Sequence, residues 1–255
     1  MSIEVIFATA AEAAPNQFGL LKALNEGGAI SWFIFLTLVV MSVFSFYILF
    51  TKLLEQNKVM KQAKQVQAGF WRASSLEEGA AKLDKNSAYR QIVDDGISAR
   101  KQHGQLADPV EAHDWLHGAM MRSEDSINNK LAGGLSFLAT VGATAPFVGL
   151  LGTVIGIYSA LIKIGIMGSA SIDVVAGPVG EALIMTAIGL FVAVPAVLAY
   201  NWLQSRNKTI ARSLSSFSND VLGFISSDGK VKPKLAAAPA RPAAKPAAKP
   251  APARK

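Results

Sequence analysis

Three long apolar runs constrain the fold of this 255-residue chain more than any other feature. They cover residues 30–50, 135–162 and 174–202. Each reaches the roughly 20 apolar residues that a helix needs to cross about 30 Å of hydrocarbon. Because backbone polar groups inside a bilayer must be satisfied within their own segment, we expect each run to form a helix. Buried helices of a large soluble core are the less favoured alternative. The sequence therefore predicts an all-α membrane protein with three transmembrane helices.

The distribution of basic residues predicts the orientation of these helices. Residues 1–29 contain one lysine and residues 167–180 contain no basic residue, whereas residues 51–130 contain twelve and residues 204–255 contain eleven. Loops rich in lysine and arginine stay on the cytoplasmic side. We therefore expect the N-terminus to be periplasmic, the C-terminus to be cytoplasmic, and the last two spans to form a hairpin. Residues 1–14 lack the basic region of a signal peptide, so we do not expect them to be a cleaved leader.

These patterns divide the chain into eight segments. In order, we expect a periplasmic N-terminal segment (1–29), transmembrane helix 1 (30–50), a cytoplasmic helical domain (51–130), transmembrane helix 2 (135–166), a periplasmic loop (167–172), transmembrane helix 3 (173–203), a cytoplasmic helical extension (204–229) and a disordered Ala/Pro/Lys tail (230–255). The tail cannot bury enough apolar surface to offset its conformational entropy.

Capping residues predict helix ends within the cytoplasmic domain. Ser74 with Glu77, or Ser75 with Glu78, can cap a short helix. The run Asp108-Pro109-Val110-Glu111 (108–111) places an N-cap residue, a proline and an acid where a helix begins. That helix can run into the second span, with a bend at Gly133-Gly134 (133–134). We expect long helical extensions rather than a catalytic fold.

Composition argues against several other classes of protein. The chain has no cysteine, so disulfides and thiolate metal sites are excluded. Its excess positive charge lies in the tail, beside the membrane, which favours an anionic lipid surface over nucleic acid as the partner. His113 and His117 resemble part of a zincin motif, but the only other histidine is His103. We expect no metal, no cofactor and no enzymatic activity.

Glu181 is the only charged residue in the 29-residue run 174–202. An ionised carboxylate at membrane depth is costly, and acids in such positions commonly lie on ion pathways. A structural role, as an interhelical hydrogen bond or an ion pair with Lys163, is the alternative. We favour the functional role.

Small residues recur at helical spacing in the last two spans. The second span carries Gly142, Pro146, Gly149, Thr153, Gly156 and Ala160, and the third carries Ala182, Thr186, Gly189, Ala193, Ala196 and Tyr200. Such stripes let two helices approach closely. They could instead line a narrow lumen, in which Thr153 and Thr186 would supply hydroxyls. Pro146 and Pro195 interrupt the two helices and free backbone carbonyls.

The same residues carry a family resemblance. LATVGATAPFVGLLGTVIGIYSAL (138–161) and VVAGPVGEALIMTAIGLFVAVPAVLAYN (174–201) resemble the two pore helices of the MotA/TolQ/ExbB proton-channel family, and most closely its ExbB branch. The resemblance extends to the three-span layout and the large cytoplasmic loop. The basic Pro/Ala tail lies outside the shared pattern.

The resemblance implies a proton-channel subunit in the bacterial inner membrane, which forms a homo-oligomer, a pentamer in this family. Its second and third helices would enclose the helix of an ExbD-like single-span partner, whose aspartate is protonated and deprotonated in turn. A TonB-like protein would carry the resulting movement to outer-membrane receptors for iron chelates and vitamins. By motif position, Thr153, Glu181 and Thr186 match the polar pore residues of the family. A TolQ-like subunit for outer-membrane integrity and division, and a passive membrane scaffold, are the alternative functions.

Overall fold

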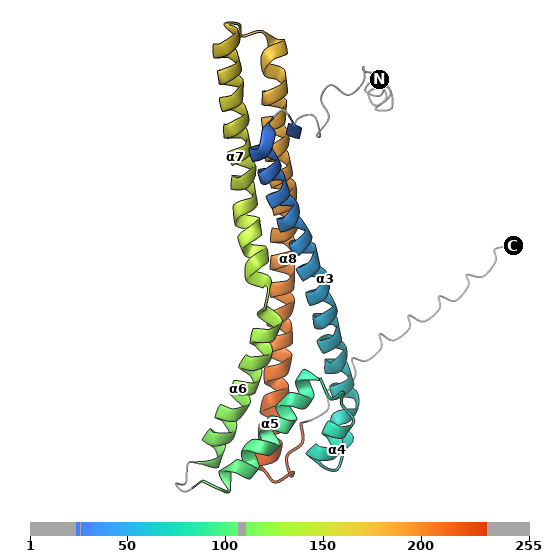
Figure 1. The fold of residues 1–255 in the computed structure, drawn as a ribbon. Helices are drawn as coiled ribbons and strands as arrows, with labels where there is room; N and C mark the ends of the chain where they lie inside the picture. The colour runs from blue at the N-terminus through green and yellow to red at the C-terminus, as the bar shows by residue number, and fades with distance from the viewer. Residues whose placement is uncertain (1–23, 26, 107–110, 234–255) are drawn as a thin grey trace, which may run out of the picture. The chain divides into compact units, whose positions relative to one another are not determined.

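The computed structural model describes residues 24–25, 27–106 and 111–233, except for the side chains of Ala68 and Asp173. Helices make up almost all of these residues (Figure 1). In chain order they are α3 (Gly28–Gly69), the 3₁₀ turn η1 (Phe70–Arg72), α4 (Leu76–Ala81), α5 (Ala88–His103), α6 (Ala112–Ala132), α7 (Leu135–Met167) and α8 (Ile172–Ser226). Most of the predicted tail and the expected helix start at residues 108–110 lie outside the described residues.

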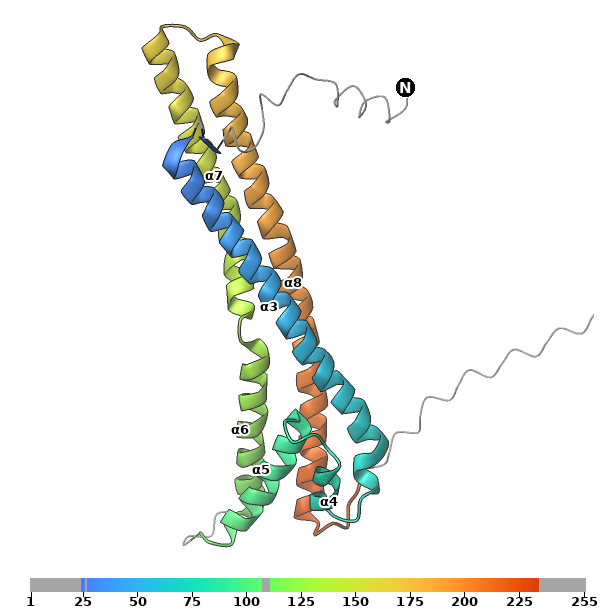
Figure 2. The same cartoon turned by 45° about the vertical axis from the view of Figure 1, so that its right-hand side comes forward.

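Three of the described helical stretches are long and apolar enough to cross a membrane. They contain the three runs that the sequence predicts, in α3, α7 and α8. The described part of the chain is thus all-helical with three candidate spans, as expected. In the turned view of Figure 2, α7 and α8 form a hairpin and α3 crosses in front of them.

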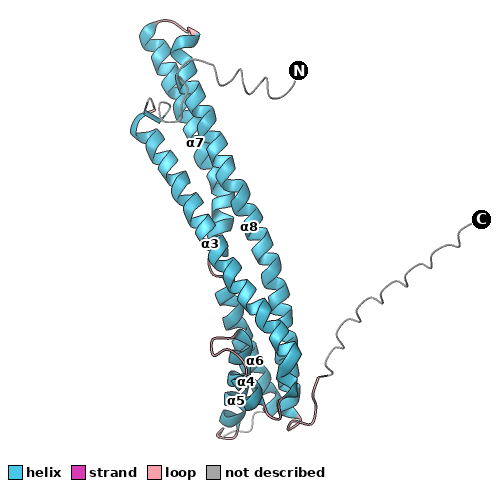
Figure 3. Ribbon diagram, turned by 90° about the vertical axis from the view of Figure 1, so that its right-hand side faces the viewer, coloured by secondary structure: helices cyan, strands magenta, loops and turns pink. Residues whose placement is uncertain are grey.

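Glycine and serine residues explain where two of the helices begin. Gly134 has a positive φ of 83°, which a residue with a side chain rarely adopts, and it separates α6 from α7. The bend expected at Gly133-Gly134 is therefore confirmed as a break. Of the two predicted caps for α4, the Ser75 side chain accepts a hydrogen bond from the Glu78 amide. Loops occupy the breaks between helices (Figure 3).

The chain divides into two compact units. Unit 1 comprises the described residues up to Lys61 together with residues 122–215, and it contains the apolar parts of α3, α7 and α8. Unit 2 comprises residues 62–121 and the described residues from Ser216 onward.

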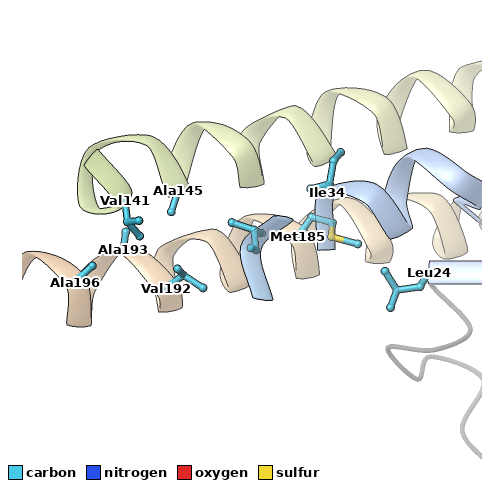
Figure 4. Packing of buried hydrophobic residues seen from close by; sticks show 9 residues of the cluster. Leu24, Ile34, Val141, Ala145, Met185, Val192, Ala193 and Ala196 are labelled. Carbon is cyan, nitrogen blue, oxygen red and sulfur yellow. The ribbon is translucent and has the colours of Figure 1, made fainter. Parts of the chain in front are cut away.

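The core of unit 1 lies where α3 packs against α7 and α8. It comprises Leu24, Ile34, Leu38, Val141, Ala145, Met185, Val192, Ala193 and Ala196 (Figure 4). Apart from Met185, the members on α7 and α8 are alanine and valine, whereas Leu24 and the α3 residues are larger. Beside it, Leu135, Leu138, Ala199 and Leu203 form a second buried cluster. Close packing without voids is what holds apolar helices together in a bilayer, since lipid supplies no hydrophobic drive.

A buried polar network ties three helices together at the end of these clusters. Gln56 on α3 is fully buried, and its Nε2 donates to the Leu203 carbonyl at 3.0 Å and to Asn207 Oδ1 at 2.7 Å. Asn207 on α8 in turn donates from Nδ2 to the Leu131 carbonyl on α6 at 3.0 Å. These three bonds link α3 to α8 and α8 to α6.

Unit 2 has an aromatic core. Phe217 on α8 lies at its centre, with ring centroids 5.1 Å from Phe70 and 5.2 Å from Tyr89. At its edge, hydrogen bonds from the Lys82 ammonium and the Ser74 hydroxyl and amide lower the pKa of Glu78 to about 2. The described residues of unit 2 thus form helices packed around a small aromatic core.

Candidate functional site

Glu181 is buried, with 3% of its surface exposed, in the third turn of α8. The hydroxyl of Ser31, on the first turn of α3, donates a hydrogen bond to Glu181 Oε1. Ser31 is itself buried, also at 3% exposure. The single acid of the third apolar run is therefore paired with a hydroxyl on the first.

Gly27 makes room for this carboxylate. A Cβ added at Gly27 would overlap Glu181 Oε1 and the Ser31 hydroxyl. Its neighbour Gly28 has open space around it, but its φ of 70° favours glycine. The two glycines therefore have different roles, since Gly28 begins α3 and Gly27 leaves space for the Glu181 side chain.

Of the two structural alternatives for Glu181, the interhelical hydrogen bond is present and the ion pair is not. Within the part of the chain that the structure describes, no salt bridge joins Glu181 to Lys163. Gly156 is level with Ala182, because a Cβ on Gly156 would lie 2.9 Å from the Ala182 Cβ. Lys163 lies seven residues further along α7, about 10 Å away along the helix axis.

The other two predicted polar residues do not meet Glu181 in the protomer. Thr186 points to α7, where its hydroxyl donates to the Gly149 carbonyl at 3.5 Å. Thr153 donates to the Leu150 carbonyl of its own helix at 2.6 Å. Five helical positions separate Glu181 from Thr186, which turns the two side chains about 140° apart. Glu181 therefore faces α3 and Thr186 faces α7.

The small residues form the contact between α7 and α8. A Cβ on Gly149 would lie 2.8 Å from the Met185 carbonyl, and one on Gly189 would lie 2.7 Å from the Ala145 carbonyl. A Cβ on Gly142 would instead overlap the Val197 side chain. Ala193 is buried in the unit 1 core. Within the protomer, close helix packing accounts for all four of these residues.

The two prolines interrupt the hydrogen-bond ladder of their helices. Pro146 is half-buried inside α7, and Pro195 is half-buried inside α8. Pro195 removes the partner of the Phe191 carbonyl. Phe191 and Pro195 line a cavity of about 10 Å³ together with Ser42 and Ser45 of α3. A cavity of this size is at the lower limit of the volume that holds one water molecule.

Ser31 and Gly27 are the two site residues that sequence reasoning missed. In the sequence, Gly27 and Gly28 lie just before the first apolar run and indicate only where it starts. The same span also carries Thr37, Ser42 and Ser45, so a hydroxyl near its start gave no specific signal. The partner of Ser31 could not be inferred, because the two residues are 150 positions apart.

The histidine pair lies on one face of α6. The rings of His113 and His117 have centroids 6.2 Å apart. Among the described residues, no group of three or more histidine, aspartate or glutamate side chains could hold a metal ion.

The sequence of this chain is similar to those of several known proteins. The sequence profile of the MotA/TolQ/ExbB proton channel family matches residues 84–216. The "Biopolymer transport protein ExbB" of Xanthomonas campestris pv. campestris (strain B100) is 38% identical over 236 residues, covering 86% of this chain and 93% of that protein. The protein of the same name from Neisseria gonorrhoeae is 47% identical over 122 residues, 48% of this chain and 56% of its own. The "Tol-Pal system protein TolQ" of Pseudomonas aeruginosa is 32% identical over 209 residues, 77% of this chain and 88% of its own.

Proposed function

Because the chain belongs to the MotA/TolQ/ExbB proton channel family, we propose that it is the proton-channel subunit of an ExbB-like energy-transducing motor in the bacterial inner membrane. The family comprises channel and transport components and is not a known enzyme family. In this proposal the N-terminus is periplasmic, and the large loop and the C-terminus are cytoplasmic. The excess of basic residues in residues 51–130 and 204–255 supports this orientation.

One observation carries the proposal: the only charged residue of the third apolar run, Glu181, is buried between α8 and α3. Burial of a titratable group within an apolar span costs a considerable amount of solvation free energy. One charge crossing 100 mV releases about 2.3 kcal/mol, so even a few protons can drive a conformational step. Glu181 is thus a suitable element of a proton pathway.

The pathway itself requires more than one copy of the chain. Glu181, Thr153 and Thr186 face different directions in the protomer, so no single chain gathers them around one lumen. Large apolar side chains on α7 and α8, such as Phe147, Val154 and Phe191, are exposed and suit contacts with lipid or other helices. We place the pore in a homopentamer, around the helix of an ExbD-like partner, with a TonB-like protein carrying the movement to outer-membrane receptors.

The TolQ-like function is the second candidate. The relatives named ExbB include the more similar full-length match, 38% identical against 32% for the protein named TolQ. This difference favours the ExbB-like function. Affinity purification of the full chain from its native membranes, followed by mass spectrometry of the co-purifying single-span protein, separates the two. A Tol-Pal system protein as the partner in place of an ExbD-like one would overturn our choice.

Substitution of Glu181 tests the proton pathway itself. Glu181→Gln preserves the shape of the side chain and its capacity to accept the Ser31 hydrogen bond, but it cannot titrate. We expect cells that carry only this variant to lose iron-chelate uptake while the complex still assembles. Uptake at the normal rate would leave the passive scaffold as the better description.

A further inference from the structure

We propose that Ser31 is a positioning residue for Glu181, so that the first membrane helix, α3, takes part in the proton pathway. This inference rests on the proposed function and adds a residue to it. The pathway would then depend on all three spans, with Glu181 held on the α3 side of α8.

Ser31 makes a different hydrogen bond from other hydroxyls of its helix. Serine and threonine hydroxyls inside helices usually bond the carbonyl four residues back. Three other hydroxyls of α3 do so: Thr37 donates to Phe33, Ser45 to Met41 and Thr51 to Tyr47. For Ser31 the residue four back is Gly27, which precedes the start of α3 at Gly28. Its hydroxyl reaches across to Glu181 instead.

The surroundings hold the carboxyl group in this place. Gly27 leaves the space that the Glu181 carboxyl group occupies, and any larger residue there would displace it. On the next position of α8, Ala182 packs against Gly156 of α7. Helix α8 is therefore oriented with Ala182 toward α7 and Glu181 toward α3.

The hydrogen bond between Ser31 and Glu181 couples α3 to α8. The hydrogen bond joins two different helices, so a shift of α3 relative to α8 makes or breaks it. Removal of the bond changes the hydrogen bonding of the one acid that we place on the pathway. Ser31 thereby couples the position of α3 to the state of Glu181.

Isotope-edited infrared spectroscopy of the purified complex, with ¹³C-labelled glutamate side chains, tests this inference. The carboxyl band of Glu181 is the one that disappears in Glu181→Gln. We expect Ser31→Ala to shift that band and to slow proton-driven uptake about tenfold, the effect of losing one hydrogen bond to an acid. Gly27→Ala should shift the same band, because its Cβ displaces the carboxyl group.

Ser45→Ala is the matched control. Ser45 is also buried on α3, but its hydroxyl bonds the Met41 carbonyl of its own helix at 2.7 Å. We expect this variant to leave the Glu181 band at the wild-type position.

The outcomes separate this inference from the proposed function. If Glu181→Gln abolishes uptake while Ser31→Ala keeps both the band and the uptake of the wild type, the positioning role is wrong and the proton pathway stands. If Glu181→Gln supports normal uptake, the pathway itself is wrong. A band shift of equal size in Ser45→Ala would also overturn the inference, because any lost hydroxyl on α3 would then suffice.

Discussion

Ser31 on α3 donates a hydrogen bond to Glu181 on α8, 150 residues later in the chain. Both side chains are buried, and Gly27 provides the space beside them. The bond joins the first apolar run to the only acid of the third run (174–202), and it orients that acid away from α7. Two other contacts and one half-buried acid have consequences that can be measured on the full chain in detergent or lipid.

Substitution of Gly149 tests the packing of α7 on α8. A Cβ on Gly149 would lie 2.8 Å from the Met185 carbonyl and 3.1 Å from the Gly189 Cα, which are backbone atoms that cannot move aside cheaply. We expect Gly149→Ala to lower the free energy of unfolding by about 1–3 kcal/mol, as overpacking does elsewhere. Thermal unfolding of the purified protein measures the loss.

Gly165→Ala is the control for that experiment. Gly165 lies in the same helix with no atom within 4 Å of its added Cβ. Alanine is the better helix former, so we expect this variant to be at least as stable as the wild type. Equal losses in both variants would mean that the close approach of Gly149 to Met185 and Gly189 does not decide the result.

Substitution of Gln56 tests the polar network that joins α3, α6 and α8. Gln56→Leu removes the donor to the Leu203 carbonyl and to Asn207 Oδ1, so the Asn207 oxygen loses this hydrogen bond. We expect a loss of about 1–3 kcal/mol in the free energy of unfolding. Because Gln56 and Asn207 share a bond, the double variant with Asn207→Leu should lose less than the sum of the two single losses.

Gln204→Leu is the control for the Gln56→Leu substitution. Gln204 is half-buried on α8 and bonds Tyr200 within the same helix at 3.1 Å. We expect its loss to be smaller than that of Gln56→Leu. Strictly additive losses at positions 56 and 207 would contradict the network.

Asp220, at the unit 2 end of α8, should make stability depend on pH. Burial raises the pKa of its carboxyl group from the ordinary value of 3.8. The native state therefore binds this proton more tightly than the unfolded chain does, and stability falls as the pH rises through the raised pKa. We expect Asp220→Asn to be slightly more stable than the wild type at pH 7.

The same measurement at lower pH checks the sign. As the pH falls to 3.8 and below, Asp220 becomes protonated in both states and the difference between the two proteins should shrink. Melting temperatures at pH 7 and at about pH 4 suffice for this comparison. An Asp220→Asn variant that melts below the wild type at pH 7 would show that the carboxylate makes a stabilising contact.

Local chemistry explains which features could be predicted from the sequence. Apolar run length identified the three spans, because the thickness of a bilayer sets the length of helix that crosses it. The Gly133-Gly134 break and the Ser75 cap followed from neighbouring residues alone. The stripe spacing identified the faces on which α7 and α8 meet, since helical periodicity places Gly149 and Gly189 on single lines.

The sequence by itself determined the family, the three apolar helices and the presence of one buried acid. Only the tertiary structure decided where that acid points. Helical periodicity separates Glu181 from Thr186 by about 140°, but it does not say which neighbouring helix lies on each side. The packing of small residues between α7 and α8 sets the rotation of α8. That rotation turns Glu181 to Ser31 and Thr186 to Gly149, two contacts between residues far apart in the chain.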